Sequence, residues 1–550
     1  MSKQLDIWPR KVNDNRKRLR AGGQVGARIA VIGAGIGGLT SAALLAARGA
    51  DVTVFEKEAW VGGKARRVSV DGAEIDGGPT VFTYRSVFDE VFAACGARLE
   101  DHVTVTRAEV IARHAWDDSG HLDLYADRDR SIDAVGAFAG AEAARGYRSF
   151  TAEAQRIFEV LEDPFLRGDK ASTPLPMIWR IGPWRMGDML AMRPFDGMWK
   201  ALGGHFKDAR LQQLFGRYAT YCGSSPFSAP ATLMLIAHVE ARGVWLIEGG
   251  IHALATAIAG LAEQQGARVR TQAPVAEVLT ANGRTSGVRL ASGEVFAADA
   301  VICNGDPGAL ATGRFGAAAA GAVPAIPPAK RSLSALVWYA HARTSGFDLT
   351  HHNVFFSRDY AREFREIGAG ATPSEPTVYV CAIDRGARIN DPAPAQGTRE
   401  RIQIIVNAPA NGDVHHYTPE ERARCTQAMM ATLTRCGLQL EDPQPEHMPH
   451  QLMTPQDWEG LFPATGGALY GRASHGWAAS FQRQGPTTRL PGLYCTGGAT
   501  HPAAGVPMAA LSGQLAARVI AQGLASMKTS RLAVTAGGMS MPSATTGSTG

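Results

Sequence analysis

The segment Gly33-Ala34-Gly35-Ile36-Gly37-Gly38 has the residue types and spacing that point most directly to chemistry. Glu56 follows eighteen positions after its last glycine. Glycines permit a tight turn and let backbone amides approach a pyrophosphate, while an acid at this spacing accepts hydrogen bonds from ribose hydroxyls. The combination predicts a dinucleotide-binding turn.

A second glycine pair, Gly62-Gly63, lies just before Lys64, Arg66 and Arg67. Glycines bring backbone close to a ligand, and these cations suit phosphate groups. A P-loop is excluded because that motif needs Ser or Thr after its lysine, where this chain has Ala65.

Two further segments could bring backbone close to a ligand. Ala73 to Thr80 reads as a short strand that ends in a turn at Gly77-Gly78. Near the C-terminus, Gly505-Val506-Pro507 opens a helical pattern that continues to about Leu524. Proline suits a helix start, and the free amides of a helix N-terminus favour an electron-rich group.

The elements that position these turns are predicted as follows. Arg28 to Ile32 and Asp51 to Phe55 are short apolar strands, and Leu39 to Arg48 is a helix, which gives a βαβ start. The same domain resumes after Gly249-Gly250, with a helix at 251–264, strands at 267–270 and 274–280, a hairpin at 287–297 and a buried strand at 300–303.

A chain of 550 residues is too long for one core. We expect an α/β fold with a Rossmann-like cofactor domain built from residues 26–100, 245–310 and 485–525. A mixed-sheet substrate domain is expected at 311–484, beginning with an Ala, Gly and Pro linker at 316–328, and a helical, membrane-facing lid at 101–244. The ends are expected to be a flexible basic arm at 1–25 and a disordered tail at 526–550.

The stretch 174–200 holds three of the ten tryptophans and five of the fifteen methionines. Such a composition suits a lipid-facing surface or a soft apolar pocket, and it equally suits a packed helical lid. The formal charge of +5 lies entirely in the first twenty residues, which hold seven Lys or Arg and two Asp. Electrostatic attraction therefore belongs to the arm, and no nucleic acid partner is expected.

Metal and nucleophile chemistry find little support in the sequence. There is no HExxH motif, no GxSxG elbow and no cysteine cluster. The pairs His351-His352 and His415-His416 are expected to point apart on strands. Seven scattered cysteines fit a reducing compartment. The chemistry is therefore expected to belong to a bound organic cofactor, with no metal.

Taken together, these motifs make the sequence resemble the flavin-dependent bacterial carotenoid desaturases of the phytoene desaturase type. The resemblance runs from about residue 28 to 524 and rests on Gly33 to Glu56, Gly62-Gly63, Asp76 to Thr80, Thr500-His501-Pro502 and Gly505-Val506-Pro507. Within that family, the segments 77–83, 218–225 and 474–477 look most like the hydroxyneurosporene (1-hydroxycarotenoid 3,4-) desaturases. One departure is Ala503-Ala504, where family members usually carry a second glycine after Thr-His-Pro.

The resemblance implies FAD as cofactor. Carried over by motif position, its contacts would be Gly33, Gly35, Gly38 and Glu56 at the pyrophosphate and ribose, with Gly63 and Lys64 beside them, Val275 near the adenine, and Gly498, Gly505, Val506 and Pro507 near the isoalloxazine ring. No catalytic acid or base is identified.

The implied reaction is desaturation of a C40 1-hydroxycarotenoid between carbons 3 and 4. A phytoene or neurosporene desaturase acting on unhydroxylated carotenoids is the near alternative. A flavin amine oxidase and a non-enzymatic carrier of prenyl lipids are more distant ones.

The expected partners are a lipophilic carotenoid, a membrane surface and an electron acceptor such as a quinone or oxygen. The N-terminus has no apolar run of a secretory signal, and no stretch reads as a spanning helix. The expected location is cytoplasmic, peripherally attached to the inner membrane.

Overall fold

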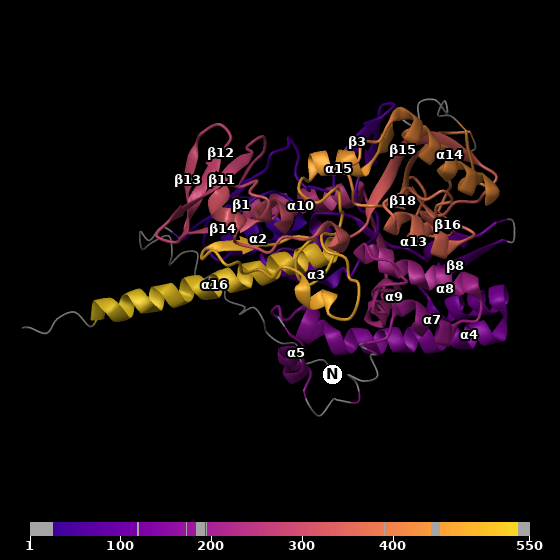
Figure 1. The fold of residues 1–550 in the computed structure, drawn as a ribbon, viewed down its shortest axis with the longest axis horizontal. Helices are drawn as coiled ribbons and strands as arrows, with labels where there is room; N and C mark the ends of the chain where they lie inside the picture. Colours follow the sequence, from indigo (N-terminus) through magenta and orange to yellow (C-terminus); the bar gives the residue numbers. More distant parts are fainter. Residues whose placement is uncertain are drawn as a thin grey trace, which may run out of the picture.

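The computed structural model describes residues 26–536, except 118–119, 172, 183–186, 188–192, 194, 390, 396 and 442–450. The predicted basic arm and the last fourteen residues of the predicted tail lie outside the described residues, as do Trp184, Met186, Met189 and Met192. Figure 1 shows the ribbon, in which two sheet-centred bodies lie side by side and the helices α4, α7, α8 and α9 lie along the lower side of one of them.

The first body is a five-stranded parallel sheet drawn from three distant chain segments. Its strand order is β10 (Arg268–Arg270), β2 (Asp51–Phe55), β1 (Arg28–Ile32), β14 (Ala300–Cys303) and β21 (Leu493–Cys495). The order is non-sequential because each parallel neighbour must return through a crossover. The predicted Rossmann-like sheet from three segments is confirmed.

Helix α2 (Ile36–Ala46) is completely buried between the sheet and helices α10 (Gly250–Gln264) and α16 (Val506–Ala536). It begins three residues before the predicted start at Leu39, so Gly37 and Gly38 lie in its first turn. A Cβ on Gly38 would lie 2.4 Å from the Gly33 carbonyl oxygen, and one on Gly513 of α16 would lie 2.5 Å from that of Gly37. Glycine is needed at both because backbone packs on backbone.

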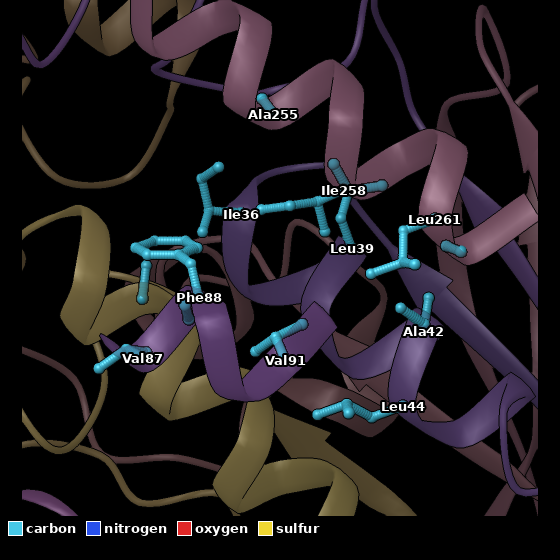
Figure 2. Packing of buried hydrophobic residues seen from close by; sticks show 14 of the residues in the cluster. Ile36, Leu39, Ala42, Leu44, Val87, Phe88, Val91, Ala255, Ile258 and Leu261 are labelled. Atoms are coloured by element: carbon cyan, nitrogen blue, oxygen red, sulfur yellow. The ribbon is translucent and has the colours of Figure 1, made fainter. Parts of the chain in front are cut away.

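The core of this body is mainly aliphatic. Figure 2 shows α2 side chains packed between those of α3 (Ser86–Ala94) and α10, among them Leu39, Val91 and Ile258. Since these side chains are fully buried, the glycine turn that precedes α2 has a rigid base.

The second body contains an eight-stranded mixed sheet. Its path is β19 (Gln439–Glu441), β15 (Ser334–Ser345), β18 (Glu400–Ala408), β17 (Val378–Ala382), β16 (His352–Phe355), β7 (Val110–Ala115) and β8 (His121–Tyr125), with β20 (Leu452–Met453) beside β15. Strands β7 and β8 come from the region predicted to be helical. Their alternating apolar residues belong to a half-buried hairpin, which completes the sheet next to β16.

Helices pack on both faces of this sheet. They are α4 (Arg128–Leu161), α5 (Pro174–Ile181), α7 (Met198–His205), α8 (Ala209–Gly216), α9 (Leu235–Ala241), α13 (Tyr360–Gly368), α14 (Pro419–Arg435) and α15 (Pro455–Leu461), with the π-helical turn η2 (Glu162–Leu166) after α4. Small ladders join the bodies: β3 (Arg67–Val70) with β4 (Ala73–Asp76), and β5 (Phe82–Thr83) with β9 (Val244–Ile247) and β6 (Val105–Arg107). A further hairpin sheet comprises β11 (Val275–Ala281), β12 (Arg284–Leu290) and β13 (Val295–Ala297).

Two further sequence expectations on the fold were wrong. The stretch 316–328 contains the short helix α12 (Ala317–Ala320), and Ala319, Ala322 and Val323 are buried against the β11–β13 sheet, so it is packed structure. Helix α16 continues through Met527 to Ala536, where a disordered tail was expected. In Figure 1 its C-terminal half extends away from the rest of the molecule.

Candidate functional site

The glycine turn lies at the carboxyl edge of the parallel sheet. Gly33 has φ +94°, and its amide donates to the Phe55 carbonyl oxygen at the end of β2 (2.8 Å). Gly35 is the N-cap of α2, so the free amides of the first helical turn lie just beyond it. This geometry is that of an anion-binding helix N-terminus.

Glu56 is buried directly after β2, beside that turn. Its Oε2 accepts from the Ala34 amide at 2.7 Å, and its Oε1 accepts from the Glu58 amide at 3.0 Å. The carboxylate is therefore held in one orientation at the edge of the sheet. It lies next to the glycine turn, as the sequence predicted.

Asn304 is a residue that sequence reasoning did not assign to the site. It follows β14, which is parallel to β1, and its Nδ2 donates to the Gly33 carbonyl oxygen at 3.2 Å. Its buried Oδ1 has no hydrogen-bond partner. A Cβ on Gly35 would lie 2.7 Å from Nδ2, and one on Gly497 would lie 2.9 Å from Oδ1. The sequence could have indicated Asn304, because a polar residue directly after a buried parallel strand lies at the carboxyl edge of the sheet, where ligands bind.

The Gly62–Lys64 loop lies against the glycine turn. The Gly62 amide donates to the Ala34 carbonyl oxygen at 2.8 Å, and the nearest atom to a Cβ on Gly63 would be the Gly35 Cα at 3.4 Å. Lys64 Nζ donates to the Leu469 carbonyl oxygen at 2.5 Å. Burial lowers the pKa of Lys64 to about 8, and the nearby Asp306 carboxylate opposes that shift. The turn and this loop thus form one continuous backbone surface.

The C-terminal motif faces the same region. Gly498 would have open space around an added Cβ, and its carbonyl oxygen accepts from Arg483, a buried cation. Gly505 has φ +110° and is exposed, while Val506 and Pro507 are buried at the start of α16. The hydroxyls of Thr500 and Ser512 lie 2.6 Å apart and tie the motif to that helix.

Val275 lies further from the turn, at the start of β11. The Ala273 amide donates to the Glu56 carbonyl oxygen at 2.8 Å, which places β11 beside the end of β2. The structure therefore brings the predicted residues of three segments to one edge of the sheet, with Val275 at its margin.

These residues fit a flavin dinucleotide. Backbone amides, a fixed carboxylate and an unpartnered amide oxygen line one edge, and side chains at Gly35, Gly38 and Gly497 would fill it or displace its backbone. Such a surface has the groups that bind the phosphates and ribose of a dinucleotide.

The adjacent histidines His351 and His352 do not point apart. His351 lies just before β16, so its ring meets that of His352 edge to face at 4.6 Å. Together with Cys381 they bring one ligand atom each within 4.8 Å of one another. His351 is already hydrogen-bonded to the Arg385 carbonyl oxygen, and burial raises the pKa of the Cys381 thiol, so these donors are not presented as a ready metal site.

Comparison with known proteins agrees with this reading of the site. A family model described as flavin-containing amine oxidoreductase matches residues 36–521. A hydroxyneurosporene desaturase of Rubrivivax gelatinosus is 50% identical over 94% of this chain and 98% of its own. A zeta-carotene-forming phytoene desaturase of Myxococcus xanthus is 30% identical over 89% of this chain and 93% of its own.

The fold is also found among solved structures. An oxidoreductase from Methanosarcina mazei superposes with a TM-score of 0.54 at 16% identity, covering 88% of this chain and 99% of its own. At that identity the likeness concerns the fold alone. The long match to the family model and the high identity to a desaturase together establish that the chain belongs to the flavin-containing amine oxidoreductase family, in its group of carotenoid desaturases.

Proposed function

We propose that this protein is an FAD-dependent desaturase that introduces the C3–C4 double bond of a 1-hydroxycarotenoid such as 1-hydroxyneurosporene. The observation that carries the proposal is the meeting of the glycine turn, the Gly62–Lys64 loop and the Gly498–Pro507 motif at one sheet edge. Identity to a named hydroxyneurosporene desaturase is 50%, against 30% to a phytoene desaturase, which favours the hydroxylated substrate.

The proposed cofactor contacts follow the site. Gly33, Gly35 and Gly38 would hold the pyrophosphate, and Glu56 would bind the ribose. Gly63 and Lys64 would lie along the phosphates, Val275 at the adenine, and Gly498 with the start of α16 at the isoalloxazine.

The reaction removes two hydrogens from adjacent carbons. When bound, FAD supplies a hydride acceptor. Carbon 4 adjoins the polyene, so the positive charge left when its C–H bond gives up a hydride is delocalised, and carbon 3 then loses a proton, which a weak base or water can accept. A quinone or oxygen would take up the two electrons. The main task of the protein is therefore to orient carbon 4 at the flavin.

The substrate is proposed to enter from a membrane surface at α5. Among the described residues, no helix is both long and apolar enough to cross a bilayer. Leu175, Trp179 and Phe195 are exposed by 66%, 74% and 75%, and Phe195 contacts Trp477, itself 48% exposed. Exposed large apolar side chains such as Leu175 and Trp179, four residues apart on α5, are typical of a membrane or protein contact.

The same helix lies close to the proposed flavin motif. Arg180 of α5 donates to the Pro164 carbonyl oxygen of η2, whose Phe165 ring meets His501 edge to face at 5.2 Å. An apolar substrate entering at α5 would therefore reach the Thr500–Pro507 segment. We propose a cytoplasmic protein attached peripherally to the inner membrane, and the seven free, buried cysteines suit that reducing compartment.

The alternatives differ in substrate and cofactor. A phytoene or neurosporene desaturase would convert the hydrocarbon, an amine oxidase would convert an amine, and a lipid carrier need not bind flavin.

The test is anaerobic and aerobic conversion by the purified, FAD-loaded protein on liposomes containing 1-hydroxyneurosporene, neurosporene or phytoene, read by chromatography with absorption spectra. A red-shifted product from the hydroxylated substrate supports the proposal. Exclusive conversion of a hydrocarbon, or no bound yellow chromophore, contradicts it.

A further inference from the structure

A polar cluster in the substrate domain lies one step from the proposed cofactor surface. The Gly77 amide donates to the Arg66 carbonyl oxygen at 2.7 Å, and a Cβ on Gly78 would lie 1.8 Å from that of Lys64. The Gly77–Thr80 turn therefore lies directly on the Gly62–Arg66 loop. Thr80, two residues after Gly78, is within about 8 Å of this contact.

The Thr80 side chain begins a short chain of hydrogen bonds. Its hydroxyl lies 2.7 Å from that of Tyr379, on β17, and the Tyr379 hydroxyl lies 2.7 Å from Nδ1 of His352, on β16. His352 is 3% exposed, and its Nε2 is buried with no hydrogen-bond partner. This series of hydrogen bonds thus ends at Nε2 of His352, which has no partner. A buried nitrogen without a hydrogen bond destabilises the fold unless a ligand supplies that bond.

In both neutral tautomers of His352, Nε2 is free to form a hydrogen bond with a ligand. If Tyr379 donates to Nδ1, then Nε2 carries a hydrogen and is a free donor. If Nδ1 carries the hydrogen and donates to Tyr379, then Nε2 is a free acceptor. Burial keeps the pKa of His352 well below its ordinary value, so the ring is neutral in either case. An alcohol both donates and accepts, and therefore satisfies either tautomer, whereas a hydrocarbon satisfies neither.

We infer that His352, supported by Tyr379 and Thr80, binds the hydroxyl group of the carotenoid substrate and makes the enzyme selective for 1-hydroxylated over unhydroxylated carotenoids. This inference rests on the proposed function. Carbon 1 is three bonds from carbon 4, so its hydroxyl lies roughly 5 Å from the reacting carbon. The group that binds this hydroxyl must therefore lie near the reacting carbon, and the hydrogen-bonded series Thr80–Tyr379–His352 begins beside the Gly78–Lys64 contact at the proposed cofactor surface.

The arrangement also assigns a direction to the substrate. The short hydroxylated end would lie deep in the protein, and the long polyene would extend towards the apolar surface of α5. A buried site built for a hydroxyl discriminates strongly against the analogue that lacks it, because the polar groups are then left unpaired.

Several neighbouring buried polar groups already have partners, although Oε1 of Gln403 does not. Tyr218 and Tyr221 donate to Glu240 at 2.6 Å and 3.0 Å, and Arg217 donates to Tyr221 at 2.8 Å. His114 lies 3.1 Å from the Leu122 carbonyl oxygen. Because their bonds are satisfied within the protein, His352 is the better candidate to receive a ligand.

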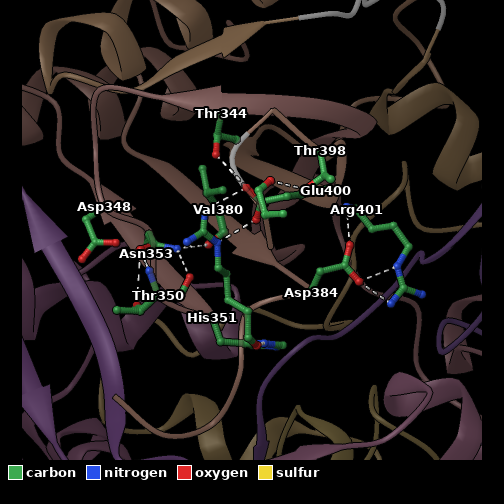
Figure 3. A network of polar contacts seen from close by, with 12 residues as sticks. Thr344, Asp348, Thr350, His351, Asn353, Val380, Asp384, Thr398, Glu400 and Arg401 are labelled. Carbon is green, nitrogen blue, oxygen red and sulfur yellow. Dashed lines mark hydrogen bonds and ion pairs between the residues drawn. The ribbon is translucent and has the colours of Figure 1, made fainter. Parts of the chain in front are cut away.

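The adjacent His351 offers a matched control. Its Nδ1 lies 2.9 Å from the Arg385 carbonyl oxygen, and the Arg385 guanidinium binds Glu400 at 2.7 Å and 2.8 Å. Figure 3 shows this network and the neighbouring Asn353, whose Nδ2 donates to the carbonyl oxygens of Thr350 and Val380. His351 is thus held by structural contacts and not presented to a ligand.

The experiment compares the FAD-loaded wild type with His352→Leu, Tyr379→Phe and His351→Leu. Steady-state kcat/KM is measured for 1-hydroxyneurosporene and for neurosporene on the same liposomes. We expect His352→Leu to lower kcat/KM about 10- to 100-fold for the alcohol and to leave that for the hydrocarbon unchanged or higher. Tyr379→Phe, which removes one oxygen and keeps the packing, should lower selectivity in the same direction. His351→Leu should leave the ratio of the two values unchanged.

Several results would overturn the inference. One is an equal loss on both substrates in Tyr379→Phe, which would make the role structural. Another is a stoichiometric transition metal in the wild type that is lost in His352→Leu, as measured by elemental analysis, which would make the His351, His352 and Cys381 group a metal site. If the wild type converts neither carotenoid, the proposed function itself has failed, and that result is separate from a loss of selectivity.

Discussion

The Oε2 atom of Glu56 accepts a hydrogen bond of 2.7 Å from the backbone amide of Ala34, between the first two glycines of the turn. One carboxylate thus holds the glycine turn in its conformation and is itself held in one orientation, as the proposed ribose contact requires. The residue that follows β2 and the loop that follows β1 therefore act as one unit.

Replacing Glu56 with alanine is expected to weaken FAD binding by about 1 to 3 kcal/mol, since ribose hydrogen bonds to a charged partner are lost. Fluorescence titration of the deflavinated protein with FAD measures the change. Glu58→Ala is the control, because that side chain contacts Lys57 at 3.1 Å on the surface. Unchanged FAD affinity in Glu56→Ala would contradict the ribose assignment.

Gly35→Val is expected to bind FAD more weakly still. A Cβ at this position would lie 2.7 Å from the Asn304 amide nitrogen, so the amide must move and the loop with it. Flavin content after purification is the readout. Gly260→Ala, in α10 where a Cβ meets nothing within 4 Å, should retain full flavin. Equal flavin in both variants would contradict the close approach inferred for Gly35.

Glu363 should make stability fall as pH rises. Burial raises its pKa to about 7, although Ser357 and Thr377 donate to it. Below about pH 4.5 both folded and unfolded states hold the proton, whereas between pH 4.5 and 7 the unfolded state releases it first. The folded state therefore loses up to about 3 kcal/mol over this window.

Glu363→Gln removes that penalty, so its Tm relative to the wild type should rise from pH 4.5 to pH 8. Thermal unfolding at a series of pH values measures the difference. A constant offset between the two curves across the range would mean that Glu363 does not titrate there.

Trp179 and Trp199 should respond differently to substitution with serine. Trp179 is 74% exposed, whereas the Trp199 ring lies 4.5 Å from that of Phe227 and 6.2 Å from that of Tyr360. Trp199→Ser should lower stability by roughly 2 to 4 kcal/mol. Trp179→Ser should leave Tm unchanged and reduce liposome co-sedimentation at both low and high salt. Binding at the wild-type level in a folded Trp179→Ser and Leu175→Ser double variant would place the docking surface elsewhere.

The basic arm should act only at low salt. Deleting residues 2–20 removes seven basic and two acidic side chains, and each cation near an anionic surface contributes about 1 kcal/mol. Co-sedimentation with anionic liposomes should fall at 50 mM salt and match the wild type at 500 mM, since screening removes the attraction. A loss that persists at high salt would indicate an apolar contribution from the arm.

The local sequence determined the cofactor half of this protein. The apolar strand Arg28–Ile32, the glycines, the strand Asp51–Phe55 and Glu56 form a unit whose geometry depends on neighbours in sequence, so spacing alone specified it. The buried strand at Ala300–Cys303 was equally clear, because a parallel strand covered on both faces is continuously apolar.

Only the tertiary structure decided what those strands bring together. Asn304 reaches Gly33 because β14 pairs with β1 across 271 positions, and Trp199 is packed while Trp179 is exposed because their helices face different neighbours. The β7–β8 hairpin was missed because its partner, β16, lies more than two hundred residues away. The unpartnered nitrogen of His352 likewise exists only where β16, β17 and the Gly77–Thr80 turn meet, since a hydrogen bond depends on position in space and not on sequence distance.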